Sequence, residues 1–283
     1  MSSTQYQINW DSVNSGGTDD STSTNFQLRD TIGEMGTGLS ASQNYQLSAG
    51  YRVGDEQEPF LALTVGTQEN STRTPWTAFS SGSNTATLSA TSSFAIGDFI
   101  GVVENVGLSQ LVAFGKITDI SGAIVTVDAW SGEPGSLSAS PSGGDDFAFR
   151  ANGGAASLGT QVPTAAGTSL TVVEVLSNVG TGYVVSVQSD DDFRNDASST
   201  IAGVTDGSVS LGSEEYGAES VGTYATSTGS DFAFSSSTPR NVQESTVYGD
   251  HDRNGVIYKL TVTASTPSGN YKHNVIYRLT PKF

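Results

Sequence analysis

A short strand motif occurs three times at the N-terminal end of the chain and constrains its fold more than any other feature. The copies are Ser3–Ile8, Ser23–Leu28 and Ser42–Leu47. Each has an aromatic and an aliphatic residue two positions apart, so an extended chain places both on one face. The segments between the copies are rich in Ser, Thr, Gly, Asp and Asn, and residues 1–53 cannot build a core of their own. We therefore predict an extended N-terminal β-arm that packs on other surfaces, in the same chain or in a neighbouring copy.

The composition is typical of an exported β-protein. Twenty-nine acidic and twelve basic residues give a net charge of −17, which argues against nucleic acid as a partner. There is no cysteine, so disulfides, thiolate metal sites and cysteine nucleophiles are excluded. No apolar run is long enough to span a membrane. The N-terminus lacks the features of a signal peptide, and we expect an extracellular, cell-surface protein whose export signal has been removed.

Residues 54–142 have the pattern of a small β-barrel or sandwich domain. Turns at Gly97, Gly107 and Gly122 separate short apolar runs at about ten-residue spacing, which favours such a compact fold. The residues of Gly132–Gly144 are typical of a linker or long loop. The expected strands are Pro59–Val65, Thr85–Leu88, Phe99–Glu104, Gln110–Ile117 and Ala123–Ala129.

Residues 143–283 have the pattern of a larger sandwich. Ser169–Leu176 and Gly182–Gln188 are rich in β-branched residues, and the five residues between them suit a hairpin. Val256–Ala264 and Tyr271–Leu279 form a second alternating pair, and we expect the last strand to be a central one. The fold predicted for the chain is all-β: an Ig-like or jelly-roll-type β-sandwich, a smaller barrel or sandwich, and the N-terminal arm.

Several segments carry a resemblance to a group of known proteins. Ser42–Tyr51, Ser177–Val185 and Thr266–Tyr271, with Ile276-Tyr277 and Thr280-Pro281, resemble predicted exported surface proteins of uncultivated small-genome bacteria. The C-terminal unit is also loosely similar to WxL-type cell-wall-binding domains and to Ig-like biofilm-fibre subunits. The resemblance implies an exported, cell-surface protein that is not an enzyme.

One segment matches the first half of a calcium-binding loop. Asp250, Asp252 and Asn254 place oxygens at alternate positions, and Gly255 permits a sharp turn. The twelfth position is Thr261 rather than Glu. The segment is therefore either a calcium site or a solvated acidic hairpin turn.

A second acidic cluster has the same two interpretations. Asp190, Asp191 and Asp192 are followed by Asn195 and Asp196, with no spacing rule that selects calcium. Calcium is the one cofactor that the sequence leaves as a candidate.

Catalytic motifs are few. No Gly-x-Ser-x-Gly elbow is present, and His273 lies on an alternating strand face where a structural role is expected. Trp10, Trp76 and Trp130 could form a sugar-stacking platform, although isolated Trp in a β-protein is more often core. We therefore expect no enzyme.

Two functions follow from this sequence. In the first, the protein is the subunit of an extracellular, pilus-like or biofilm filament, a head-to-tail homopolymer. Tyr6, Ile8 and Trp10 then alternate on an intermolecular strand donated by the N-terminal arm to the next copy. In the second, the protein is a monomeric surface adhesin, or a module that binds carbohydrate or cell wall.

Overall fold

The computed structural model describes residues 60–141 and 143–282, together with four short strands nearer the N-terminus. The chain forms two compact units, Met1–Pro59 and Phe60–Phe283. In the first unit β1 (Ser21–Thr22) pairs with β2 (Gln27–Leu28), and β3 (Gly38–Ala41) pairs with β4 (Gln46–Ala49). Strand β2 thus ends the second copy of the repeated motif, and β4 overlaps the third. The first copy, with Tyr6, Ile8 and Trp10, lies outside the described residues.

The second unit confirms the all-β prediction. Its fourteen strands form three antiparallel sheets, and within the described residues the only helix is a single 3-10 turn, η1 (Asn70–Thr72). No described helix has the length and apolar character of a membrane span. The strands are β5 (Leu61–Thr67), β6 (Thr74–Ser80), β7 (Thr85–Leu88), β8 (Phe99–Glu104), β9 (Leu111–Ser121), β10 (Ile124–Val127), β11 (Ser131–Gly132), β12 (Phe147–Arg150), β13 (Gly167–Ser177), β14 (Tyr183–Ser189), β15 (Glu215–Val221), β16 (Arg240–Ser245), β17 (Gly249–Thr261) and β18 (Val275–Pro281).

The strands from β6 to β12 form a small closed barrel. The sheet order is β10-β7-β6-β12-β8-β9-β11, and β10 also pairs with β9, which closes a ring of six strands and leaves β11 paired with β9 alone. The interior holds Trp76 and Trp130 with the aliphatic side chains of the alternating strands. Trp76 is 1% exposed, and its indole N–H donates to the Val103 carbonyl oxygen at 3.0 Å. These two tryptophans are therefore core, and the sugar-platform alternative is wrong for them.

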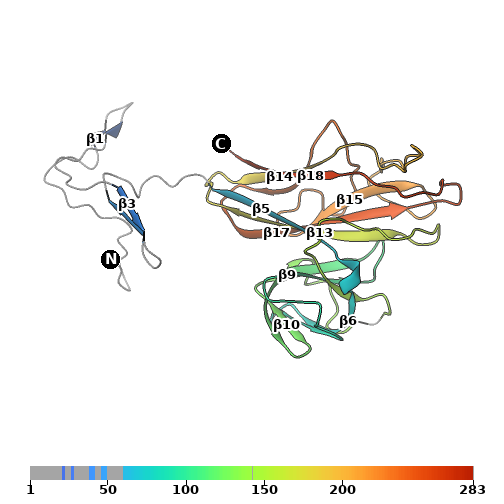
Figure 1. Cartoon of the computed structure of the whole chain (residues 1–283), viewed down its shortest axis with the longest axis horizontal. Helices are drawn as coiled ribbons and strands as arrows, with labels where there is room; N and C mark the ends of the chain where they lie inside the picture. The colour runs from blue at the N-terminus through green and yellow to red at the C-terminus, as the bar shows by residue number, and fades with distance from the viewer. Residues whose placement is uncertain are drawn as a thin grey trace. The chain divides into compact units, whose positions relative to one another are not determined.

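The remaining strands form a sandwich of four strands facing three. One sheet has the order β15-β17-β13-β5, the other the order β16-β14-β18. Figure 1 shows β14 and β18 on one side of the four-stranded sheet and the barrel strands β6, β9 and β10 on the other. The predicted all-β fold is thus confirmed, with a two-sheet sandwich beside a smaller barrel.

The four-stranded sheet is buried on both faces, which explains the continuous apolar run of β13. Val173 and Val175 pack toward the three-stranded sheet, whereas Leu170 and Val172 pack against the barrel. All four side chains are fully buried. A strand covered on both sides needs apolar residues at consecutive positions rather than at alternate ones.

A buried arginine ties the barrel to this sheet. Arg253 of β17 donates from Nε to Glu174 Oε2 at 2.6 Å and from Nη1 to Asp128 Oδ1 at 2.7 Å. Asp128 follows the barrel strand β10, and Glu174 lies on β13. Burial favours the uncharged form, but the two carboxylates still hold the pKa of Arg253 above its ordinary value. The ion pairs therefore fix one face of the barrel against the sandwich.

Strand pairing places two strands across the predicted domain boundaries. β5, from the predicted 54–142 domain, pairs with β13 of the sandwich. β12, from the predicted 143–283 domain, pairs with β6 and β8 of the barrel. The barrel is thus inserted between two adjacent strands of the sandwich, because β5 and β13 are neighbours in one sheet although about 100 residues apart.

Both predicted hairpins of the C-terminal unit are wrong. β13 and β14 lie in different sheets, so the segment between them crosses the sandwich. β17 and β18 are likewise in different sheets, and β18 lies at an edge rather than in the centre. The predicted alternation of β18 is correct: Val275, Tyr277 and Leu279 pack on the core.

Candidate functional site

Strand β5 is an edge strand whose outer backbone groups point away from the sheet. Thr67 exchanges two backbone hydrogen bonds with Gly153, of 2.8 and 2.9 Å, on the side away from β13. Because these directions repeat every second residue, the backbone N–H and C=O groups of Leu61, Leu63 and Val65 also point outward. No hydrogen bond of these three backbone positions beyond the sheet is found in the described part of the chain.

Strand β18 has the same arrangement at the edge of the facing sheet. Asp190 N donates to Asn274 O, and Lys282 N donates to Gly182 O, so the even-numbered residues of β18 pair with β14. The backbone groups of Val275, Tyr277 and Leu279 therefore point outward. The side chains of these three residues face the core, as do Leu61 and Leu63 of β5. Among the described residues, the two open edges thus combine unpaired backbone groups with apolar side chains.

The segment that crosses between the sheets holds one end of each edge strand. Phe60, just before β5, donates its backbone N–H to Asn178 Oδ1 at 2.6 Å. Lys282, just after β18, donates its backbone N–H to Gly182 O at 3.0 Å. β5 therefore begins, and β18 ends, at the same end of the sandwich. Both strands run along one side of it.

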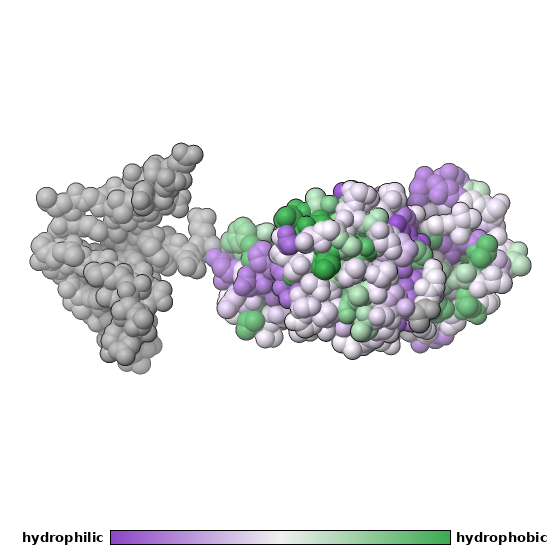
Figure 2. All heavy atoms as spheres, turned by 90° about the horizontal axis from the view of Figure 1, so that it is seen from below, coloured by the Kyte–Doolittle hydropathy of each residue, from purple (hydrophilic) through white to green (hydrophobic). Residues whose placement is uncertain are grey.

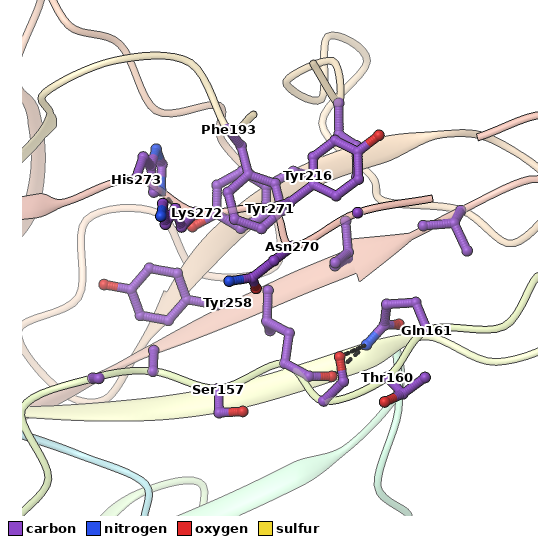
Figure 3. A pocket seen from close by; sticks show the side chains of 18 of the residues that line it. Ser157, Thr160, Gln161, Phe193, Tyr216, Tyr258, Asn270, Tyr271, Lys272 and His273 are labelled. Carbon is purple, nitrogen blue, oxygen red and sulfur yellow. Dashed lines mark hydrogen bonds between the residues drawn. The ribbon is translucent and has the colours of Figure 1, made fainter. Parts of the chain in front are cut away.

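A groove of about 1210 Å³ lies beside the two edge strands, near the end of β5 and the start of β18. Val65 and Thr67 of β5 and Val275 and Tyr277 of β18 line it, together with residues of the segments 153–163 and 262–274 and several buried aromatic and aliphatic residues. Figure 3 shows Ser157, Thr160 and Gln161 on one wall, opposite the rings of Phe193, Tyr216 and Tyr271. The groove therefore combines a polar wall with an aromatic one.

The aromatic wall is a column of stacked rings. Tyr216 stacks on Phe193 with centroids 4.3 Å apart, and Phe234 lies between Tyr216 and Tyr258 with centroids 5.4 Å from each. His273 packs edge-on against three of these rings, at 5.1 to 5.6 Å. Such ring pairs add to the stability that burial alone provides. Because the ring faces contact one another, the column is a wall of the groove rather than a free stacking platform.

Hydrogen bonds and burial keep this wall uncharged. The Tyr258 and Tyr277 hydroxyls are 2.7 Å apart, and burial raises the pKa of Tyr258 to about 12. His273 Nε2 lies 3.0 Å from the Tyr216 hydroxyl, and burial lowers the pKa of this histidine. The aromatic side of the groove is therefore neutral near pH 7 and suits apolar or uncharged polar groups.

The residues of the predicted calcium loop lie in an extended strand. Asp250, Asp252 and Asn254 belong to β17, in which Asp252 pairs with Val175 across the sheet. The Asp252 carboxylate accepts the Tyr183 hydroxyl at 2.7 Å, inside the sandwich. Pairing with β13 thus extends a segment that would have to curve around the ion in a calcium loop.

The second acidic cluster contacts neighbouring side chains. Asp190 accepts both the backbone N–H and the side-chain amide of Asn274, at 2.8 and 2.6 Å. Asp191 pairs with Arg194, and Asp196 pairs with Lys272 at 3.3 Å. No group of three or more Asp, Glu, His or Cys side chains in the described ranges is close enough to hold a metal ion.

The groove was not found by sequence reasoning. The signal for one of its edges was present in Tyr271–Leu279, whose alternation shows that one face is buried. Nothing in that alternation shows whether both backbone edges of the strand are paired. Comparison of the chain with protein-family models, with curated proteins and with solved structures finds no significant match.

Proposed function

We propose that the protein is the structural subunit of an extracellular, cell-surface filament, in which an N-terminal strand of one copy is added to the open side of the sandwich of the next. One observation carries this proposal. Two edge strands, β5 and β18, border one groove with an aromatic wall, and within the described residues each directs unpaired backbone groups outward from residues whose side chains pack on the core. Main-chain hydrogen bonds to such an edge provide affinity, and side-chain pockets set the register.

The first copy of the repeated motif has the chemistry that this groove requires. Tyr6, Ile8 and Trp10 alternate along the chain, so a strand that contains them presents three apolar side chains on one face. Five extended residues span about 17 Å. That length is within the seven residues of β5.

Strand addition between copies leads to a polymer. A head-to-tail contact leaves one donor strand and one open groove at the two ends of every assembly, so growth does not stop by closure. The same strand in the groove of its own chain would give a monomer. The oligomeric state therefore separates the proposed function from its alternative.

The test removes the donor strand. The full chain is expected to form fibres in negative-stain electron microscopy, whereas a chain without residues 1–13 is expected to stay monomeric and folded. A full chain that elutes at 29.3 kDa at every concentration, or fibres that persist after the deletion, would contradict the proposal.

A matched pair of substitutions tests the face of the strand. Ile8→Asp places a charge among the groove residues and is expected to prevent assembly, whereas Gln7→Asp adds the same charge on the opposite face and leaves assembly intact. Equal effects of the two changes would show that the strand does not bind through its apolar face.

The alternative function, a monomeric adhesin or a carbohydrate-binding module, is favoured by the polar wall of the same groove. Ser157, Thr160, Gln161 and Asn270 offer hydroxyl and amide groups beside the aromatic wall (Figure 3). Titration of the monomeric deletion variant with soluble peptidoglycan fragments tests it. Saturable heat, lost on Gln161→Ala, together with a full chain that never forms fibres, would favour this alternative.

A further inference from the structure

A buried lysine lies against two carboxylates on the sheet face opposite the groove wall. Lys259 Nζ is 2.9 Å from Asp231 Oδ1 and 3.1 Å from Glu219 Oε2. The side chains of Lys259 and Asp231 are 7% and 5% exposed, and that of Glu219 is 17% exposed. The other three lysines of the chain, Lys116, Lys272 and Lys282, have side chains between 26% and 68% exposed.

Three neighbouring backbone segments hold these side chains in place. Lys259 lies on β17 and Glu219 on β15, which pair antiparallel along their lengths. Phe232, the residue after Asp231, exchanges two backbone hydrogen bonds with Ala218 of β15, of 2.7 and 3.0 Å. The amine and both carboxylates therefore come from segments whose separation is set by main-chain hydrogen bonds.

A glycine across from the lysine allows close packing beside it. Gly217 lies directly across from Lys259, and side chains on such a pair share one face of the sheet. A Cβ atom at Gly217 would lie 2.6 Å from a methyl carbon of Val204 and 3.0 Å from Phe232 O. The space above Gly217 is thus closely packed, and it excludes water from the lysine and its partners.

The two oxygens of the Asp231 carboxyl group face different partners. Its Oδ2 accepts the buried backbone N–H of Val209 at 2.8 Å. Its Oδ1 is buried and accepts no hydrogen bond of ordinary geometry from any described residue, although Lys259 Nζ lies 2.9 Å away. A backbone donor on the carboxyl oxygen stabilises the negative charge that develops there when a nucleophile adds to the carbon.

Burial lowers the pKa of Lys259, but Asp231 and Glu219 hold it above its ordinary value. One ammonium and two carboxylates leave a formal charge of −1 in a largely buried site, where an uncompensated charge is costly. Transfer of one proton from Lys259 to Asp231 gives a neutral amine beside a neutral carboxylic acid. Condensation of the two leaves Glu219 as the only charged group of the three.

We propose that Lys259 and Asp231 are joined by an isopeptide bond that forms within the folded chain. The Lys259 amine adds to Cγ of protonated Asp231 to form the C–N bond, while the Val209 N–H stabilises the oxyanion. Glu219 accepts a proton from the nitrogen and returns it to the departing hydroxyl group. The C–O bond breaks, and one water molecule leaves. The reaction consumes an amine and a carboxylic acid and needs no oxidant or further reactant.

The fold supplies what this condensation lacks in solution. Fixed contact between amine and acid replaces a collision, which raises the effective concentration by many orders of magnitude. Exclusion of water opposes the reverse hydrolysis. Arg253, which lies between the buried Glu174 carboxylate and the partly exposed Asp128 carboxylate, cannot react in this way because its guanidinium stays protonated.

Mass spectrometry of the purified, denatured full chain tests the proposal. The expected mass is that of the sequence less one water molecule, and an unmodified mass after prolonged incubation of the folded chain would overturn it. Trypsin digestion locates the bond. A blocked Lys259 prevents cleavage after it, so residues 254–272 are expected to be joined to residues 195–240.

Variants separate the bond from other losses of water. Lys259→Arg keeps the positive charge and is expected to restore the full mass, whereas Lys272→Arg, at an exposed lysine, retains the loss. Asp231→Asn still presents a carboxyl derivative and is expected to lose ammonia instead of water. Glu219→Gln is expected to slow the reaction. If trypsin releases separate 195–240 and 254–259 peptides from the wild-type chain, the bond is absent. This result does not depend on whether any variant folds.

Discussion

The barrel and the sandwich are built from similar alternating strands but differ in whether the edges of their sheets are paired. In the barrel, β10 pairs with both β7 and β9, so the sheet closes on itself. In the sandwich, β5 and β18 each pair with another strand on one side only and lie beside a groove; on its outer side β5 forms a single bridge, between Thr67 and Gly153. An unpaired edge is a template for another strand, and natural proteins usually cover it. This difference is the reason why we propose strand binding at the open side of the sandwich and not at the barrel.

The first prediction tests the closed region at its core. Trp76→Ala removes the largest fully buried side chain of the barrel and leaves the Val103 carbonyl without its donor. We expect a loss of about 3–5 kcal/mol in the free energy of unfolding, measured by urea denaturation. Val65→Ala at the open edge, where the side chain is 37% exposed, is the control and is expected to cost about 1 kcal/mol or less. Equal costs would remove the contrast between the two regions.

The second prediction concerns the contact between barrel and sandwich. Arg253→Met leaves the buried Glu174 carboxylate without its closest partner and is expected to cost about 3 kcal/mol of stability. Lys116→Met, which removes a half-exposed amine 3.9 Å from Glu174, is expected to change the stability by less than about 1 kcal/mol. Thermal or urea unfolding measures both. A small effect of Arg253→Met would show that apolar packing alone joins the two regions.

The third prediction distinguishes the two sides of the edge strand β5. Thr64 donates its backbone N–H to β13, so Thr64→Pro is expected to destabilise the fold by about 3 kcal/mol. Val65 directs its N–H outward, so Val65→Pro is expected to leave most of the stability but to reduce strand addition. Urea denaturation and electron microscopy give the two readouts. Fibres from Val65→Pro as abundant as those from the unchanged chain would exclude β5 as an acceptor edge.

The fourth prediction concerns the aromatic wall of the groove and is the smallest. Burial lowers the pKa of His273 from 6.5, despite the nearby Asp190, Asp191 and Asp192. The unfolded chain therefore binds a proton at a higher pH than the folded chain, and stability falls as pH drops below 6.5. Because the ring is only partly buried, we expect this contribution to be under about 1 kcal/mol. His273→Phe should flatten the pH dependence of the unfolding free energy between pH 7 and 5 relative to the unchanged chain, and an identical slope would contradict the assignment.

Strand positions were predictable from local pattern, whereas strand partners were not. Thr85–Leu88 and Phe99–Glu104 are strands with the predicted bounds, because apolar alternation and turn residues act within a few positions. The five residues after β13 also looked like a hairpin loop, yet they cross between sheets. A loop of that length permits either connection, and the choice depends on β17, which lies more than 70 residues further along the chain and pairs with β13.

The candidate sites show the same division. Asp252 and Asn254 fitted a local spacing rule, but pairing with β13 straightened their segment. Lys259, Asp231 and Glu219 have no spacing rule and meet only because β15, β17 and the segment around Phe232 lie side by side. The side chains that surround a lysine in a sheet come from neighbouring strands, and the order of the sequence does not show which strands these are.

The sequence by itself determined the all-β class, most strand positions, the faces of β18 and the N-terminal repeat, because each depends on residues a few positions apart. Only the tertiary structure decided that the barrel closes, that it is inserted between β5 and β13, that β5 and β18 stay open beside one groove, and that Lys259 is buried between two carboxylates. The physical reason is that backbone hydrogen bonds in sheets join any two strands that meet in space. A strand's own residues specify which face is buried, and its neighbours specify whether its edges are paired.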